Sequence, residues 1–231
     1  MTRRVAVIAL MALVTHSAPT EAQQHSSFPI DPGLTWIYRG HIRWTGPDRR
    51  VHDDSITWTM KIVSVRTGPY ARAALAQGWV QDLAWHEPSK KPTYCALIGR
   101  AGRLYHVAAL DSASAVALLD SAVRAAALPP SVSDLVLDSA LLVGAVYGRD
   151  SATGKRDDTM YGWYVASDRV IAAQAAWKAA NTRVRRVTLE YRTQPDYQLI
   201  EFVPGVGITR FVYSHHGTVA ETDVRLISMK R

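Results

Sequence analysis

Cysteine is almost absent from this sequence, which has a single thiol, Cys95, among its 231 residues. One cysteine cannot form a disulfide within the chain, so the stability of the fold must come from a hydrophobic core. Cys95 lies in an apolar segment, residues 93–98, that is typical of a strand, and we expect a buried, inert thiol rather than a nucleophile. Because no cysteine follows the N-terminal apolar run, we expect a protein that is released rather than anchored through a lipid.

Long apolar runs and the familiar catalytic motifs are missing as well. Beyond the N-terminal run, no segment approaches the roughly 18 consecutive apolar residues of a membrane-spanning helix, so we expect a soluble mature protein. The sequence has no G-x-S-x-G, no HExxH and no paired cysteines, which mark common hydrolases and zinc sites. Residues 204–207 (Pro-Gly-Val-Gly) lack the third glycine and the helix of a dinucleotide-binding loop and predict a turn. These absences predict no catalytic residues, no cofactor and no metal.

The N-terminal segment, residues 1–22, has the pattern of an export signal. Arg3 and Arg4 form a positive start, residues 5–14 form an apolar run, and small side chains precede a cleavage site after Ala22. A buried N-terminal helix is the alternative reading of this run. Cleavage leaves a chain that is long enough for one domain with a core of its own. We therefore expect the protein to be exported, and to be periplasmic or secreted after cleavage.

The formal net charge is +7, and the positive side chains are spread along the chain. Short arginine clusters occur at residues 49–50 and 183–186. A nucleic-acid-binding module would more often gather such residues on one helix or among stacking aromatics, so we expect no nucleic-acid partner. A basic exported protein can still meet anionic surfaces such as lipid head groups or polysaccharide.

Alternation of apolar and polar residues predicts strands over much of the chain. Residues 34–45 and 55–66 alternate with a period of two, as half-buried strands do. Turn-forming residues separate the further strand candidates, which indicates an antiparallel meander. These further candidates are residues 70–80, 93–98, 103–109, 160–166, 187–192, 197–203, 208–214 and 218–228.

The middle of the chain differs from the two ends. Residues 112–128 are rich in alanine, carry apolar residues at helical spacing, and have Asp111 or Ser112 as a candidate N-cap. Residues 168–181 predict a second helix. Residues 131–143 are ambiguous between helix and strand.

This order of elements predicts an α+β fold. We expect one globular domain over residues 34–231, preceded by the signal segment and a short lead-in at residues 23–33. The domain is expected to be a curved antiparallel sheet, or half-open barrel, packed around one or two helices.

Polar candidates for a chemical site are few. His215 and His216 lie at a predicted turn, and a metal there would need a third ligand from a distant segment. We therefore expect a hairpin tip with solvated imidazoles. The paired acids at residues 53–54 and 157–158 lie in predicted loops, whereas acid–base catalysis needs two carboxylates held apart across a cleft.

Aromatic residues in the strand-like segments are the most suggestive feature. On one interpretation they fill a packed core. On the other they line a cup for an apolar or amphiphilic ligand, because aromatic walls give a large contact area and Trp and Tyr add a polar tip. The sequence leaves both open. The candidate ligand-binding residues are Trp36, Tyr38, Trp58, Trp163 and Tyr164.

Two segments resemble the opening and closing strands of many uncharacterised exported bacterial proteins. Residues 28–38 (Phe-Pro-Ile-Asp-Pro-Gly-Leu-Thr-Trp-Ile-Tyr) are similar to their proline, glycine, tryptophan and tyrosine opening. Residues 201–208 (Glu-Phe-Val-Pro-Gly-Val-Gly-Ile) are similar to their closing segment, in which a Pro-Gly-X-Gly turn joins two strands. The resemblance implies a bacterial envelope protein built on a curved sheet, similar to periplasmic lipoprotein-carrier folds, and it supplies no catalytic residues.

The sequence thus favours a non-enzymatic binding or carrier module for a hydrophobic, amphiphilic or envelope-derived ligand. The alternative is a structural or interaction protein of the envelope without a small-molecule site. A hydrolase with an unrecognised site is the third hypothesis. An open apolar cavity would favour the first, whereas a packed core with an exposed apolar patch would favour the second.

Overall fold

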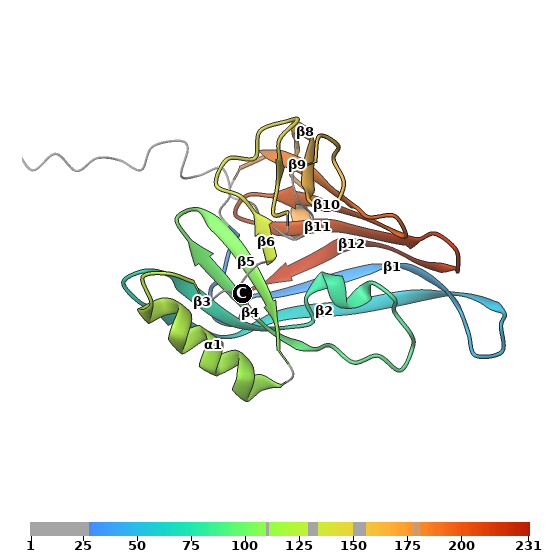
Figure 1. Ribbon diagram of the computed structural model, residues 1–231, viewed down its shortest axis with the longest axis horizontal. Helices are drawn as coiled ribbons and strands as arrows, with labels where there is room; N and C mark the ends of the chain where they lie inside the picture. The colour runs from blue at the N-terminus through green and yellow to red at the C-terminus, as the bar shows by residue number, and fades with distance from the viewer. Residues whose placement is uncertain (1–27, 110, 129–133, 150–155, 178, 180) are drawn as a thin grey trace, which may run out of the picture.

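The computed structural model describes residues 28–109, 111–128, 134–149, 156–177, 179 and 181–231. Its main feature is one antiparallel sheet of twelve strands, in the order β6-β5-β4-β3-β2-β1-β12-β11-β10-β9-β8-β7 (Figure 1). The strands are β1 (Thr35–Thr45), β2 (Val51–Thr67), β3 (Arg72–Gln77), β4 (Tyr94–Arg100), β5 (Arg103–Ala108), β6 (Asp134–Leu137), β7 (Val146–Tyr147), β8 (Trp163–Ala172), β9 (Arg183–Arg192), β10 (Asp196–Val203), β11 (Gly207–His215) and β12 (Ala220–Lys230).

The sheet consists of two meanders joined in the middle. The first and last strands, β1 and β12, pair with each other, so the two ends of the domain meet at the centre of the sheet. The predicted antiparallel meander is therefore confirmed for the described residues. A strand-rich domain of this kind has mostly non-local contacts, which only the folded topology brings together.

The two edge strands of the sheet, β6 and β7, approach each other. They do not pair, but the Tyr147 hydroxyl on β7 donates a hydrogen bond to the Val136 carbonyl on β6 at 2.8 Å. The sheet is consequently more closed than the expected half-open barrel. We call this meeting line of β6 and β7 the seam.

Inside the curled sheet lies one large apolar core. The inward residues of both meanders are buried, and Phe28 from the lead-in reaches the rings of Trp36, Trp79 and Phe202 at centroid distances of 5.6, 5.7 and 6.5 Å. The strands alternate between this core and the outer face, as their sequence pattern predicted.

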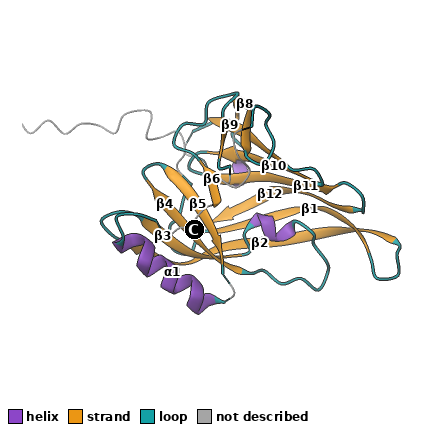
Figure 2. Cartoon of the chain, viewed as in Figure 1, coloured by secondary structure: helices purple, strands orange, loops and turns teal. Residues whose placement is uncertain are grey.

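The single α-helix of the described residues, α1 (Ser112–Arg124), lies on the outer face of β3 and β4 (Figure 2). It buries Ala115, Leu119 and Ala122 in a second apolar cluster against the outward residues of those strands. Both faces of β3 and β4 are thus covered, which explains why these strands are apolar without alternation. The expected arrangement, a sheet packed around its helices, is therefore wrong: the helix packs outside the sheet.

Helix α1 begins where the sequence predicted, after the candidate N-cap Asp111. The Asp111 carboxylate accepts a hydrogen bond from the Ser114 backbone N–H at 2.7 Å, as an N-cap does. The predicted helix at residues 112–128 is confirmed as far as Arg124. Residues 129–133, which include the first part of the ambiguous segment, lie outside the described residues.

The second predicted helix, at residues 168–181, is wrong. Its first residues continue strand β8 to Ala172, and only a 3-10 turn, η4 (Ala175–Trp177), follows. Pairing of Val170 and Ile171 with β9 favours the extended form that β-branched side chains prefer, and this outweighs the helical spacing of the alanines. A second 3-10 turn, η2 (Val80–Leu83), lies between β3 and β4 and buries Val80 and Leu83 in the main core.

No helix in the part of the chain that the structure covers has the length and apolar character needed to cross a membrane. The predicted signal segment lies outside the described residues.

Candidate binding pocket

A small pocket opens beside the seam. It has a volume of about 200 Å³. Five elements contribute to it, η2, β6, β8, β9 and β10, together with Gly148 after β7. Its lining residues are Gln81, Asp134, Leu135, Val136, Gly148, Trp163, Tyr191 and Gln198.

Two glutamine amides form the floor of the polar side. The Gln81 Nε2 atom donates to Gln198 Oε1 at 3.1 Å, and the Trp79 indole donates to Gln81 Oε1 at 2.9 Å. Gln81 is thus held by both of its amide atoms. The Gln198 oxygen is committed to Gln81, which leaves the Gln198 NH₂ as a donor for another acceptor.

A partly buried histidine contacts this arrangement through Trp79. His106 stacks on Trp79 with a centroid distance of 5.5 Å and an interplanar angle of 17°. Burial lowers the pKa of His106 to about 4, so the imidazole is neutral near pH 7. The ring that stacks on Trp79 is therefore uncharged.

Asp134 is the one charged residue of the lining. It begins β6, where its backbone pairs with His106 on β5. Although Asp134 is exposed, desolvation by its neighbours raises the pKa of its carboxyl above the usual value, because the ionised form is less well solvated there. None of the eight lining residues is a lysine or an arginine. A ligand in this pocket therefore meets one acidic group and no basic group.

The opposite side of the pocket is aromatic. The rings of Trp163 on β8 and Tyr191 on β9 lie next to each other across the strand pair, with their centroids 5.4 Å apart. Gly148 closes the side toward β7. A Cβ atom at Gly148 would lie 2.8 Å from the Leu135 carbonyl oxygen, and its φ of +68° disfavours other residues, so glycine is required where the seam closes.

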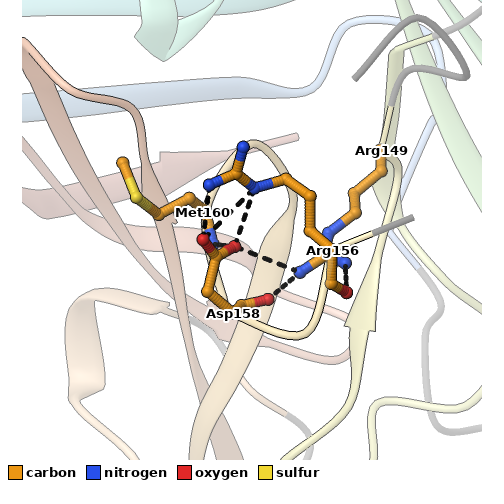
Figure 3. A network of polar contacts seen from close by, with 4 residues as sticks. All are labelled: Arg149, Arg156, Asp158 and Met160. Carbon is orange, nitrogen blue, oxygen red and sulfur yellow. Dashed lines mark hydrogen bonds and ion pairs between the residues drawn. The ribbon is translucent and has the colours of Figure 1, made fainter. Parts of the chain in front are cut away.

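A network of arginines braces the chain next to Gly148 (Figure 3). Arg149 donates to the Arg156 carbonyl at 2.6 Å and also to the Asp158 carbonyl. The Asp158 carboxylate in turn accepts from Arg156 Nε at 3.0 Å and from the Met160 N–H at 3.0 Å. The hydrogen bond from Arg156 lowers the pKa of Asp158 to about 2. Asp158 is therefore an ion-paired residue that braces this loop.

Of the five aromatic residues predicted to bind a ligand, Trp163 lines this pocket. Trp36, Tyr38 and Trp58 are buried in the main core. Their polar atoms donate to the carbonyls of Val206 at 2.7 Å, Ile208 at 3.0 Å and Gly78 at 2.9 Å, respectively. Tyr164 follows Trp163 on the strand, is half-buried and points to the other face. Contact of these residues with a ligand stays a prediction.

His215 and His216 differ from each other. His216 is exposed, as expected for a hairpin tip. The expectation of a solvated imidazole is wrong for His215, which hydrogen-bonds through Nδ1 to Asp196 Oδ1 at 3.1 Å and lies 4.3 Å from the Trp85 ring. Among the described residues, no group of three or more His, Cys, Asp or Glu side chains could hold a metal ion. The contacts of His215 connect Trp85, which follows η2, to Asp196 on β10.

Sequence reasoning missed the polar half of the pocket. Gln81, Asp134 and Gln198 stand far apart in the chain, and isolated amides and acids carry no spacing pattern. The sequence predicts a strand that contains Tyr191, but nothing in the sequence indicates that this strand adjoins the strand of Trp163. Only the pairing of β8 with β9 and the folding of η2 against β10 bring these residues together.

No family model matches the chain, and no curated protein matches it. Two solved structures are similar to it at low identity. An exported protein of Bacteroides fragilis with a YmcC-like fold is 11% identical with a TM-score of 0.40, covering 89% of this chain and 99% of that one. A lipoprotein of Parabacteroides distasonis is 12% identical with a TM-score of 0.38, covering 88% and 97%.

Proposed function

We propose that the protein is an exported, non-enzymatic binding module whose site is the pocket at the seam. The observation that carries the proposal is the convergence of Asp134, Gln81 and Gln198 opposite the rings of Trp163 and Tyr191. Small-molecule sites usually combine apolar or aromatic walls with a small number of polar groups that point into the same space. They often contain a titratable residue whose pKa is shifted.

The chemistry of the lining selects the ligand. Amide and carboxylate groups suit hydroxyl or amine donors, and aromatic rings suit the apolar faces of a compact ring or a cation. With one acidic residue and no basic residue, the pocket favours a neutral or cationic ligand over an anionic one. We therefore propose a small hydroxyl- or amine-bearing unit of an envelope component.

The size of the pocket limits the ligand further. About 200 Å³ is below the range of roughly 300–1,000 Å³ that holds drug-sized ligands. The main core around Trp36, Tyr38 and Trp58 is filled by side chains. An amphiphilic ligand would consequently place only its polar end in the pocket, with its apolar part outside.

A titration with small probes tests this proposal. D-glucosamine and methyl α-D-glucoside are the cationic and neutral probes, and glycerol 3-phosphate is the anionic control, each followed by calorimetry. We expect saturable binding of the first two and none of the third. Asp134→Asn should weaken glucosamine binding by about tenfold or more, which corresponds to the loss of one charge-assisted hydrogen bond.

A matched variant separates the pocket from general effects of charge. Asp54→Asn removes an exposed carboxylate on β2, away from the pocket, and should leave glucosamine binding unchanged. Binding of glycerol 3-phosphate in preference to glucosamine, or the absence of saturable binding for both expected probes, would contradict the proposal.

An interaction protein of the envelope remains the second candidate function. The packed core and a group of exposed aliphatic side chains around residues 142–143 favour it. A binding module that also docks to a larger surface would combine the two candidates.

A further inference from the structure

The most exposed aliphatic side chains of the described residues lie together at one place. Leu142, Val170 and Val143 have exposed fractions of 67%, 61% and 59%, the three highest among the large hydrophobic residues there. Leu142 and Val143 stand in the connection between β6 and β7. Val170 stands on β8 opposite Arg185, and Arg185 lines the same hollow as Leu142 and Val143. We call Leu142, Val143 and Val170 the aliphatic tip.

The exposure of the tip is fixed by its surroundings. The backbone after it is tied to β8, because the Gly144 N–H donates to the Val165 carbonyl at 2.9 Å and the Val165 N–H donates to the Ala145 carbonyl at 3.0 Å. Before it, Leu141 is buried in the main core and its carbonyl accepts from Arg185 at 3.0 Å. Leu142 and Val143 therefore cannot turn inward without breaking these contacts.

Positive charge lies next to the aliphatic tip. Val170 pairs with Arg185 and Ala172 pairs with Arg183, so both arginines share a face of the β8–β9 ribbon with Val170. Arg185 is ion-paired with Asp168 at 2.9 Å, whereas Arg183 is exposed. A hollow of about 350 Å³ lies beside the tip between residues 139–143 and the Asp168–Arg185 pair.

This combination of features suits a membrane surface better than a protein partner. A stable protein interface buries about 20–30 residues on each side and favours aromatic and methionine side chains. The tip offers three aliphatic side chains, two on the connection between β6 and β7 and one on β8. Insertion of a few apolar side chains beside an exposed cation such as Arg183 suits weak binding to a bilayer that carries anionic lipids. The net charge is +7 for the full sequence and +6 without residues 1–22, and it adds long-range attraction to such a surface.

We infer that the protein docks reversibly on anionic lipid bilayers by inserting Leu142 and Val143, with Val170 at the water–lipid boundary and Arg183 against the head groups. This inference does not depend on the pocket function, because the tip shares no lining residue with the pocket. Docking would hold the protein at the envelope membrane without a membrane-spanning segment.

Vesicle co-sedimentation tests the inference. The probes are phosphatidylcholine vesicles with about one-third phosphatidylglycerol and vesicles of phosphatidylcholine alone. We expect binding to the mixed vesicles at low ionic strength, weaker binding to the neutral ones, and a marked loss at about 1 M salt, where the Debye length falls to about 3 Å. The double variant Leu142→Ser/Val143→Ser should bind the mixed vesicles about tenfold or more weakly.

Two further variants test whether vesicle binding is specific to the aliphatic tip. Val63→Ser removes an exposed aliphatic side chain on β2 and should bind as the unchanged protein does. Leu142→Cys can be labelled with an environment-sensitive dye, because the native thiol Cys95 is only 1% exposed. Its emission should shift to the blue on mixed vesicles.

Three results would overturn the inference. One is equal vesicle binding by the double variant and the unchanged protein. Another is the absence of both sedimentation and a dye shift on mixed vesicles. The third is a concentration-dependent dimer in light scattering that the double variant abolishes, which would assign the aliphatic tip to a second copy of the chain.

Discussion

The Tyr147 hydroxyl donates a hydrogen bond to the Val136 carbonyl at 2.8 Å and so joins the two edge strands of the sheet. Both residues are buried, and Val136 also lines the pocket. This contact therefore links the closure of the sheet to the geometry of the candidate site.

Removing that hydroxyl should weaken the seam. Tyr147→Phe leaves the buried Val136 carbonyl without its donor, and we expect the free energy of unfolding to fall by about 1–2 kcal/mol. Urea unfolding followed by far-UV circular dichroism measures the change. Tyr164→Phe, on the half-buried residue of the neighbouring strand, is the control and should differ from the unchanged protein by less than about 0.5 kcal/mol. Equal stability of both variants would show that the seam contact does not contribute.

The centre of the sheet depends on a glycine. A Cβ atom at Gly40 on β1 would lie 1.9 Å from the Asp223 carbonyl oxygen on β12, so any side chain forces the two strands apart. We expect Gly40→Ala to destabilise the protein by about 3 kcal/mol or more, since β1–β12 pairing joins the two meanders. Thermal unfolding measures it. His41→Ala, at the exposed neighbouring residue, should change the stability little, and similar melting temperatures for the two variants would contradict the β1–β12 register.

Asp196, which is hydrogen-bonded to Tyr213 and His215, should make the stability of the fold depend on pH in the acid range. Although partial burial opposes it, hydrogen bonds from Tyr213 and His215 lower the pKa of Asp196 below its usual value. A carboxylate with a depressed folded-state pKa contributes stability above its unfolded-state pKa of about 3.9, and this contribution is lost as the pH falls through the folded-state value. We expect Tyr213→Phe to lower the unfolding free energy by about 1.5–3 kcal/mol near neutral pH and by less in strong acid.

Urea unfolding at a series of pH values checks this expectation. Tyr70→Phe removes an exposed hydroxyl and serves as the control. A cost of Tyr213→Phe that stays constant from neutral pH to strong acid would rule out a role for the charged form of Asp196.

The N-terminal segment predicts processing after Ala22. Expression with the segment intact should give exported material whose N-terminus is Gln23, because small residues precede that bond and an apolar run precedes them. Intact-mass spectrometry of the exported protein measures this. Exported material that retains Met1 would exclude cleavage.

The sequence predicted local structure where local chemistry decides it. Period-two alternation identified β1 and β2, and the Asp111 cap identified the start of α1. The pattern failed at residues 168–181, where pairing with β9 outweighed alanine-rich helical spacing. It also could not place α1 on the outer face of β3 and β4, because apolar runs such as 73–76 look the same whichever face a helix covers.

The candidate site was predictable only in part. Trp163 was identified because aromatic residues on strands are conspicuous in a sequence. Gln81, Asp134 and Gln198 acquire a common environment through the curl of the sheet and the inward fold of η2, neither of which has a spacing signature. The buried hydrogen bonds of Trp36 and Tyr38 to carbonyls about 170 residues away belong to the same class of non-local contact.

The central claim is that ligands enter the pocket at the seam. Nuclear magnetic resonance spectra of ¹⁵N-labelled protein, recorded during a titration with D-glucosamine, test it most directly. The account predicts that the side-chain amide signals of Gln81 and Gln198 and the indole signal of Trp163 shift together and saturate, while the indole signals of Trp36 and Trp58 stay in place. Saturable shifts at Trp36 and Trp58 without shifts at the two glutamines, or no saturable shift at any of them, would contradict it.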